Sequence, residues 1–130
     1  MVFKEENMAD GKKILVIDDD QDLRQALRAF LEANGYVICE ADSAENGIRV
    51  YKAERPDAIV VDLMMEEVDS GVNFVKELRL QGNTAPVFLL SGAGDSVSTG
   101  TDYSQLGFSG VFQKPLNHNR LLNVLETKLK

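Results

Sequence analysis

The feature that most constrains the fold of this chain is an alternation between short, continuous apolar runs and longer amphipathic stretches. The first run, residues 14–17, reads ILVI and is followed directly by three aspartates. Successive strand residues point to opposite faces of a sheet, so an unbroken apolar run predicts a strand that is covered on both faces. Similar runs occupy residues 36–39, 58–61, 87–90 and 110–112. We therefore predict five buried strands.

The stretches between these runs carry the spacing of amphipathic helices. Residues 20–34 place apolar side chains three and four positions apart, with Asp20 as a candidate N-cap and Asn34-Gly35 as the stop. A second helix is expected between Ser43 and Pro56. A third is expected around Phe74 and Leu78, before Gly82, and the last helix carries the leucines from 121 to 129.

The stretch from Ser96 to Gln105 is a weaker helix candidate, because it is rich in Ser, Thr and Gly. Its low helix propensity predicts a helix that is short, frayed or mobile. With this element, five helices alternate with five strands. That order predicts an α/β fold in which a parallel sheet has helices on both faces.

Length and charge fit one domain. The chain has 130 residues, with 14 basic and 21 acidic side chains and a formal net charge of −7. We expect residues 1–11 to form a polar tail and residues 12–130 to form the domain. The acidic balance argues against nucleic acid as a direct ligand. Cys39 is the single cysteine, so it has no internal disulfide partner, and we expect it to be a small buried strand residue.

Polar residues follow four of the predicted strands. Asp18-Asp19 ends the first strand, Asp62 the third and Ser91 the fourth, and the fifth runs into Lys114-Pro115. Ligands of an open parallel sheet bind outside the carboxyl ends of its strands. We therefore expect three carboxylates, a hydroxyl and an ammonium at one edge of the sheet.

Converging carboxylates require a cationic partner, because two unit charges about 5 Å apart repel by roughly 3 kcal/mol at an effective dielectric constant near 20. Mg²⁺ is the natural partner for such oxygen ligands. A bound metal, the Lys114 ammonium and a nucleophilic carboxylate together are the parts of a phosphoryl-transfer site.

With these motifs, the chain resembles the receiver domain of two-component response regulators. The resemblance covers residues 12–129 and includes ILVIDDD, VVDLMM, FLLSG and FQKP in that order. It implies a flavodoxin-like, doubly wound sheet with strand order 2-1-3-4-5. It also implies a chemotaxis-regulator-like signalling switch.

The resemblance also implies roles for individual residues. Asp62 would accept a phosphoryl group, Asp19 would bind Mg²⁺ directly, and Asp18 would act through the metal or its water. The backbone carbonyl of Met64 would complete the protein ligands. In addition, Ser91 would donate a hydrogen bond to one phosphoryl oxygen and Lys114 would pair with another.

The expected switch residues are Ser91 and Val111, and the second departs from the family pattern. Receiver domains usually carry an aromatic residue three positions before the lysine, where this chain has Val111. Phe112 does not replace it, because neighbouring strand residues point to opposite faces. A second departure is Glu66-Glu67, which stands where a Pro-Gly turn is common.

The resemblance further implies a sensor histidine kinase or a histidine phosphotransfer protein as the phosphodonor. A downstream protein or a linked output domain would receive the signal. A homodimer through residues 96–105, the strand at 110–112 and the last helix is compatible with it. We expect a cytoplasmic protein, either a stand-alone regulator or part of a longer chain. It would catalyse only its own phosphorylation and dephosphorylation, without membrane or direct nucleic-acid contact.

Two alternatives remain open. The first is a receiver-like interaction module that works without phosphorylation, although such modules typically lose the acidic pair or the lysine. The second is a phosphatase of the haloacid dehalogenase type, suggested by Asp18-x-Asp20, whose nucleophile would be Asp18. The residue that acquires the phosphoryl group separates the three hypotheses: Asp62, Asp18 or neither.

Overall fold

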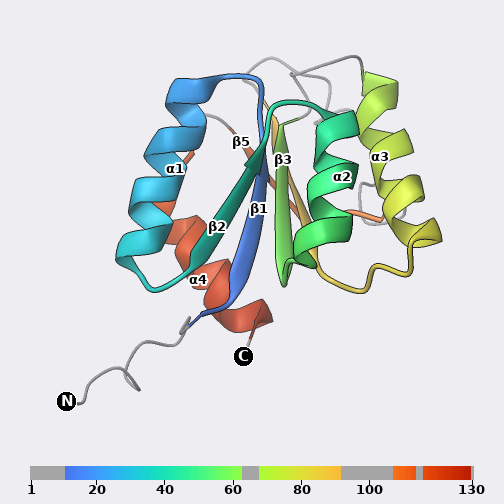
Figure 1. Cartoon of the computed structure of the whole chain (residues 1–130). Helices are drawn as coiled ribbons and strands as arrows, with labels where there is room; N and C mark the ends of the chain where they lie inside the picture. The colour runs from blue at the N-terminus through green and yellow to red at the C-terminus, as the bar shows by residue number, and fades with distance from the viewer. Residues whose placement is uncertain (1–10, 63–67, 92–106, 114–115, 130) are drawn as a thin grey trace.

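The computed structural model describes residues 11–62, 68–91, 107–113 and 116–129. Strands and helices alternate through these ranges (Figure 1). In chain order they are β1 (Lys13–Ile17), α1 (Gln21–Ala33), β2 (Val37–Ala41), α2 (Ala44–Glu54), β3 (Ala58–Asp62), α3 (Val68–Leu80), β4 (Val87–Ser91), β5 (Gly110–Gln113) and α4 (His118–Lys128). The predicted helix over residues 96–105 lies outside the described residues, as does nearly all of the predicted tail.

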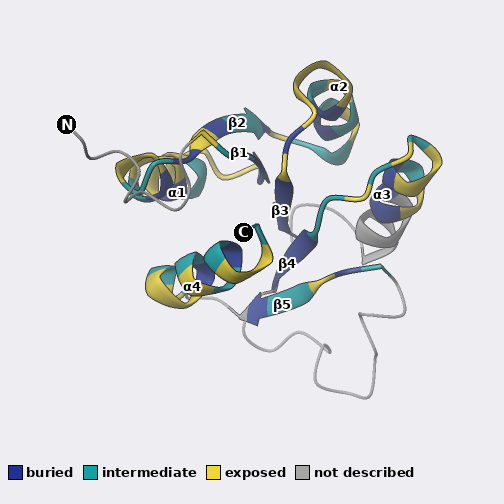
Figure 2. Cartoon of the chain, turned by 90° about the horizontal axis from the view of Figure 1, so that it is seen from below, coloured by how far each residue is buried: buried dark blue, intermediate teal, exposed yellow. Residues whose placement is uncertain are grey.

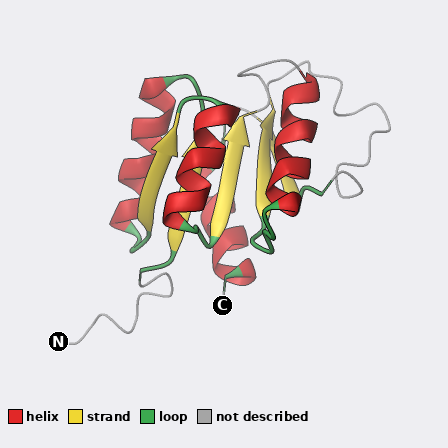
Figure 3. Cartoon of the chain, turned by 45° about the vertical axis from the view of Figure 1, so that its right-hand side comes forward, coloured by secondary structure: helices red, strands yellow, loops and turns green. Residues whose placement is uncertain are grey.

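The five strands form one parallel sheet with the order β2-β1-β3-β4-β5. Helices α1 and α4 cover one face of this sheet, and α2 and α3 cover the other (Figures 1 and 2). The predicted doubly wound topology is therefore confirmed. All strands run in the same direction, so their carboxyl ends share one edge, the upper edge in Figure 3.

Two hydrophobic cores explain the continuous apolar runs. In β1, Ile14 and Val16 pack into the core under α1 and α4, whereas Leu15 and Ile17 pack into the core under α2 and α3. All four side chains are fully buried. Burying each of them contributes roughly 1.5–3 kcal/mol relative to an exposed position. The helices add Leu27, Leu31, Leu121 and Leu125 on the first side and Tyr51, Phe74, Val75 and Leu78 on the second.

Most helix ends agree with the sequence signals. The Ser43 hydroxyl accepts a hydrogen bond from the Asn46 N–H at 3.1 Å and caps α2. Helix α1 ends at the C-cap Asn34, and Gly35 follows with φ +94°, a conformation that glycine adopts without strain. The cap of α4 is a new finding: the Asn117 side chain accepts from the Arg120 N–H at 3.0 Å, so this helix begins at His118.

Strand β2 is an edge of the sheet, which corrects the expectation for Cys39. Its side chain is half-buried rather than buried, and its thiol donates a hydrogen bond to the Ile14 carbonyl with an S···O distance of 3.7 Å. Burial raises the pKa of the Cys39 thiol to about 11.

Within the ranges that the structure describes, no helix combines the length and apolar character needed to cross a bilayer.

Candidate functional site

Two buried aspartates lie at the carboxyl edge of the sheet, on neighbouring strands. Ile17 of β1 pairs in register with Val61 of β3, so Asp18 and Asp62 are the next residues of two adjacent parallel strands. Asp18 is fully buried and Asp62 is 3% exposed. Ionised carboxylates are rarely buried unless a charge or hydrogen bonds compensate them. Their burial at the carboxyl ends of two neighbouring strands therefore points to a functional site.

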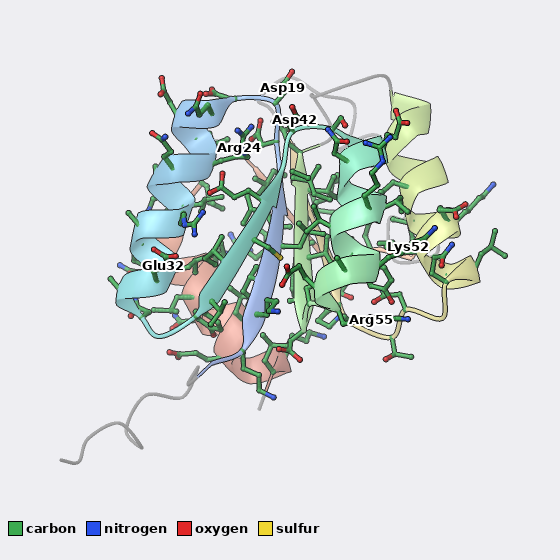
Figure 4. All side chains as sticks on the ribbon, in the orientation of Figure 1. Asp19, Arg24, Glu32, Asp42, Lys52 and Arg55 are labelled. Carbon is green, nitrogen blue, oxygen red and sulfur yellow. The ribbon has the colours of Figure 1, made fainter. Side chains whose placement is uncertain are left out.

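The three consecutive aspartates after β1 have three different environments. The Asp18 carboxylate accepts a hydrogen bond from the Asp20 N–H at 2.9 Å, which closes a tight turn. The Asp20 carboxylate accepts from the N–H groups of Asp22 and Leu23, at 3.0 and 3.2 Å, and caps α1 as predicted. Asp19 is exposed and lies at the top of the molecule in Figure 4. The turn thus keeps one carboxylate buried and presents the next one to solvent.

Strand β2 also holds this acidic turn, through the main chain. The Asp18 N–H donates to the Ala41 carbonyl at 3.1 Å. Asp42 follows at the end of β2, where its carboxylate accepts from the Asn46 amide at 2.6 Å. That hydrogen bond holds the pKa of Asp42 below its usual value. Ile17 pairs in register with Ala41, so Asp42 follows β2 at the same end of the sheet at which Asp18 follows β1.

An arginine that the sequence analysis did not single out also contacts the turn. Arg24, on α1, donates from Nη1 to the Asp18 carbonyl oxygen and from Nε to Glu40 Oε1, the latter at 3.0 Å. Glu40 Oε2 also accepts from Arg28 Nη1 at 2.6 Å. Burial raises the pKa of Glu40, but its hydrogen bonds with Arg28 and Arg24 outweigh that effect and leave this pKa lowered. The sequence does hold a signal for this cluster: Arg24 and Arg28 are one helical turn apart, and Glu40 lies near the end of the next strand.

The donor chemistry of the edge fits a hard cation such as Mg²⁺. Asp18, Asp19 and Asp62 offer only oxygen ligands, which Mg²⁺ prefers. Over the described ranges, however, no three acidic, histidine or cysteine side chains form a group that could hold a metal ion. The metal therefore remains a proposal. Such an ion would neutralise negative charge beside Asp62.

The remaining predicted site residues follow from the register only in part. Asp62 pairs with Leu90, and Ser91 pairs with Gln113, so the ends of β3, β4 and β5 lie in order along the edge. The side chain of Ser91 is not described. Lys114, Met64 and residues 66–67 lie outside the described residues, and their roles remain predictions.

Val111 and Phe112 point to opposite faces of the sheet, as predicted. Val111 packs against the core under α2 and α3. Phe112 belongs to the core under α1 and α4, where its ring centroid lies 6.0 Å from that of Phe88. Phe112 therefore does not provide an aromatic side chain on the face of Val111.

The doubly wound sheet with two buried aspartates at its carboxyl edge defines the class: a flavodoxin-like α/β domain with an acidic site. Residues 14–126 match the family model of the response regulator receiver domain. The chain therefore belongs to the response regulator receiver domains.

Known proteins similar to this chain agree with that family. It is 34% identical over 118 residues to "Response regulator MprA" of Mycolicibacterium vanbaalenii, a match that covers 91% of this chain and 50% of that protein. The MprA of Mycobacterium ulcerans gives the same identity and coverage. The chain spans about half the length of the curated relatives it matches.

Solved structures show the same fold. The chemotaxis response regulator CheY4 of Vibrio cholerae is 28% identical with a TM-score of 0.79, and the match covers 92% of this chain and 99% of that one. The receiver domain of the Francisella response regulator 1452 is 29% identical with a TM-score of 0.78, covering 92% and 100%.

Proposed function

We propose that this domain is a phosphoacceptor switch in which Asp62 takes a phosphoryl group from a histidine kinase or a histidine phosphotransfer protein. The observation that carries this proposal is the burial of Asp62 at the end of β3, next to the equally buried Asp18 at the end of β1. Membership of the receiver family supports it. Separately, the −7 charge argues against direct nucleic-acid binding.

The chemistry is transfer between two nucleophiles. A carboxylate oxygen of Asp62 attacks phosphorus in line with the phosphohistidine bond, and a P–O bond forms as the P–N bond breaks. The electron pair of the broken bond stays on the imidazole nitrogen of the donor. Charge on the phosphoryl oxygens must be neutralised in this step.

The surrounding residues would supply that neutralisation. Asp18, Asp19, Asp62 and the Met64 carbonyl would hold Mg²⁺, which offsets charge on the phosphoryl oxygens when bound. Lys114 would pair with one phosphoryl oxygen, and Ser91 would donate to another. The domain would catalyse only its own phosphorylation and dephosphorylation.

The output would come from a population shift. A phosphoryl group can favour one conformation only by binding it more strongly than the other. Movement of Ser91 toward the phosphoryl group would be the local event, and the surface around Val111 would respond. The recipient would be a protein, either separate from this chain or linked to it. We expect the domain to act in the cytoplasm.

The test is phosphorylation by acetyl phosphate and Mg²⁺, followed by intact mass and peptide mass spectrometry. Wild type should gain one labile phosphoryl group on Asp62, and Asp62→Asn should gain none because an amide is a poor nucleophile. Asp42→Asn is the matched control, since it removes an exposed aspartate at the same edge. An adduct on Asp18, or full labelling of Asp62→Asn, would refute the proposal. No adduct on wild type would favour an interaction module that works without phosphorylation.

A second variant tests the division of roles. Lys114→Ala should leave Mg²⁺ binding nearly unchanged and impair the conformational response to phosphorylation. Loss of Mg²⁺ binding in this variant would contradict the role proposed for Lys114.

A further inference from the structure

Arg24 connects the acidic turn to strand β2 through one planar group. Its Nη1 donates to the Asp18 carbonyl oxygen, and its Nε donates to Glu40 Oε1 at 3.0 Å. The side chains of Arg24 and Glu40 are only 14% and 20% exposed. Figure 4 shows Arg24 between α1 and β2, just below Asp19 and Asp42.

The carbonyl that Arg24 holds belongs to the peptide that joins Asp18 to Asp19. The orientation of this peptide sets the directions in which the two flanking side chains leave the backbone. A second hydrogen bond holds the peptide on the other side of Asp18: the Asp18 N–H donates to the Ala41 carbonyl of β2 at 3.1 Å. The turn is thus held from β2 twice, directly by Ala41 and through Arg24 by Glu40.

Glu40 is itself held in place, which leaves Arg24 little freedom. Arg28 Nη1 donates to Glu40 Oε2 at 2.6 Å, so the two carboxylate oxygens have different arginine partners. Arg28 also donates from Nε to Glu32 Oε2 at 2.9 Å, on the exposed side of α1. Arg28 therefore supports Glu40 and has a second acidic partner away from the acidic turn, whereas Arg24 contacts the turn itself.

We propose that Arg24 is a positioning residue that preorganises the acidic turn for Mg²⁺. This inference rests on the proposed function. A residue that orients a metal ligand without touching the metal typically changes metal affinity by 10–100-fold when it is lost. A guanidinium with donors on two nitrogens suits this role better than an ammonium, whose donors share one atom.

The sign of the effect separates positioning from simple electrostatics. Arg24 is a cation near a cation site, so as a charge alone it would repel Mg²⁺, and its removal would strengthen binding. As a positioning residue, its removal weakens binding. Arg24→Lys keeps the charge and therefore isolates the geometry.

The experiment compares Arg24→Lys and Arg24→Ala with the matched controls Arg49→Lys and Arg49→Ala. Arg49 is an exposed arginine of α2 whose hydrogen bonds go to Asn46 and Glu45 of the same helix. Mg²⁺ affinity is measured from the dependence of thermal unfolding on Mg²⁺ concentration. We expect at least about tenfold weaker binding in both Arg24 variants and less than twofold change in both Arg49 variants. Unchanged or tighter Mg²⁺ binding in the Arg24 variants would overturn the inference. Normal phosphorylation of Asp62 in wild type would show that the proposed function still holds in that case.

A metal-free measurement makes this test independent of the proposed function. The Asp20 N–H donates to the Asp18 carboxylate, so its exchange with solvent reports on the closure of the turn. Without Mg²⁺, Arg24→Lys should exchange this amide faster than wild type and Arg49→Lys, while amides of β3 exchange at the wild-type rate. Equal exchange at Asp20 in all three proteins would overturn the positioning role. Absence of any Mg²⁺ effect in wild type would instead refute the proposed metal site.

Discussion

The replacement Gly47→Ala tests how closely α2 packs on the strand that leads into the acidic site. Gly47 is a buried residue of α2, one turn after the N-cap Ser43, whose carbonyl accepts the Gly47 N–H at 2.8 Å. A Cβ atom at this position would lie 2.6 Å from Ile17 Cδ1 and 3.3 Å from both Ile17 Cγ1 and Phe74 Cε1. Ile17 is fully buried and directly precedes Asp18, so the added methyl group must displace core side chains beside the site.

Two opposing effects set the magnitude. In a helix interior, alanine is favoured over glycine by about 1 kcal/mol. Overpacking a dense core typically costs about 1–3 kcal/mol. Because the contact of 2.6 Å cannot persist, we expect the cost to exceed the gain, with a net loss of about 1 kcal/mol. For 130 residues, this loss corresponds to a fall in Tm of about 4 °C.

A double-mutant cycle with Ile17→Val makes the reasoning refutable. The valine lacks the Cδ1 atom nearest to the added methyl group, and Ile17→Val alone should cost about 0.5–1.5 kcal/mol. In that background Gly47→Ala should become neutral or stabilising, since the helix preference remains. The four proteins are compared by urea unfolding. A loss for Gly47→Ala that is the same in both backgrounds would refute the proposed contact, as would a rise in Tm in the wild-type background.

Three further predictions concern ionisable side chains. Mg²⁺ should raise the Tm of Asp18→Asn less than that of wild type. The control Glu45→Gln, at a side chain that is 81% exposed, should show the wild-type rise. An equal rise in Tm for Asp18→Asn and wild type would contradict a role for Asp18. The lowered pKa of Glu40 means that its stabilisation is present above the ordinary pKa of a glutamate and is lost as the pH falls through the folded-state pKa. Glu40→Gln should therefore cost about 1–2 kcal/mol at pH 7 and progressively less in acid, and a cost that does not vary with pH would count against this pairing. The pKa of the Cys39 thiol is about 11 in the folded protein instead of 9.0. At pH 8, iodoacetamide should therefore alkylate Cys39 about a hundredfold more slowly in the folded protein than in the urea-unfolded protein. Equal rates would show that folding does not protect the thiol.

Local signals predicted most of the fold because they depend on nearest neighbours in the chain. The ILVI run at residues 14–17 implied a strand covered on both faces, and the two cores confirm it. The capping residues Asp20 and Ser43 were identifiable because an N-cap bonds to backbone only two or three residues away. The cap Asn117 was not predicted, although it too bonds to a backbone N–H only three residues away.

Long-range pairing is what the sequence signals lacked. Cys39 was expected to be buried because its run is apolar, but β2 is an edge strand, and an edge strand has a neighbour on one side only. Arg24 was unremarkable as a polar helix residue. Its contact with Asp18 and Glu40 depends on how α1 crosses the sheet.

The amino-acid sequence by itself determined the strand and helix order, the residues at the strand ends and the resemblance to receiver domains. These properties are encoded in periodicity and in short motifs, each of which spans only a few residues. The tertiary structure alone decided that Asp18 and Asp62 are both buried side by side, that Glu40 and Arg24 hold the acidic turn, and that Val111 and Phe112 pack into different cores. The physical reason is that burial and ion pairing depend on which segments contact one another in the folded chain. Those contacts are set by the register of parallel strands and the packing of helices across them.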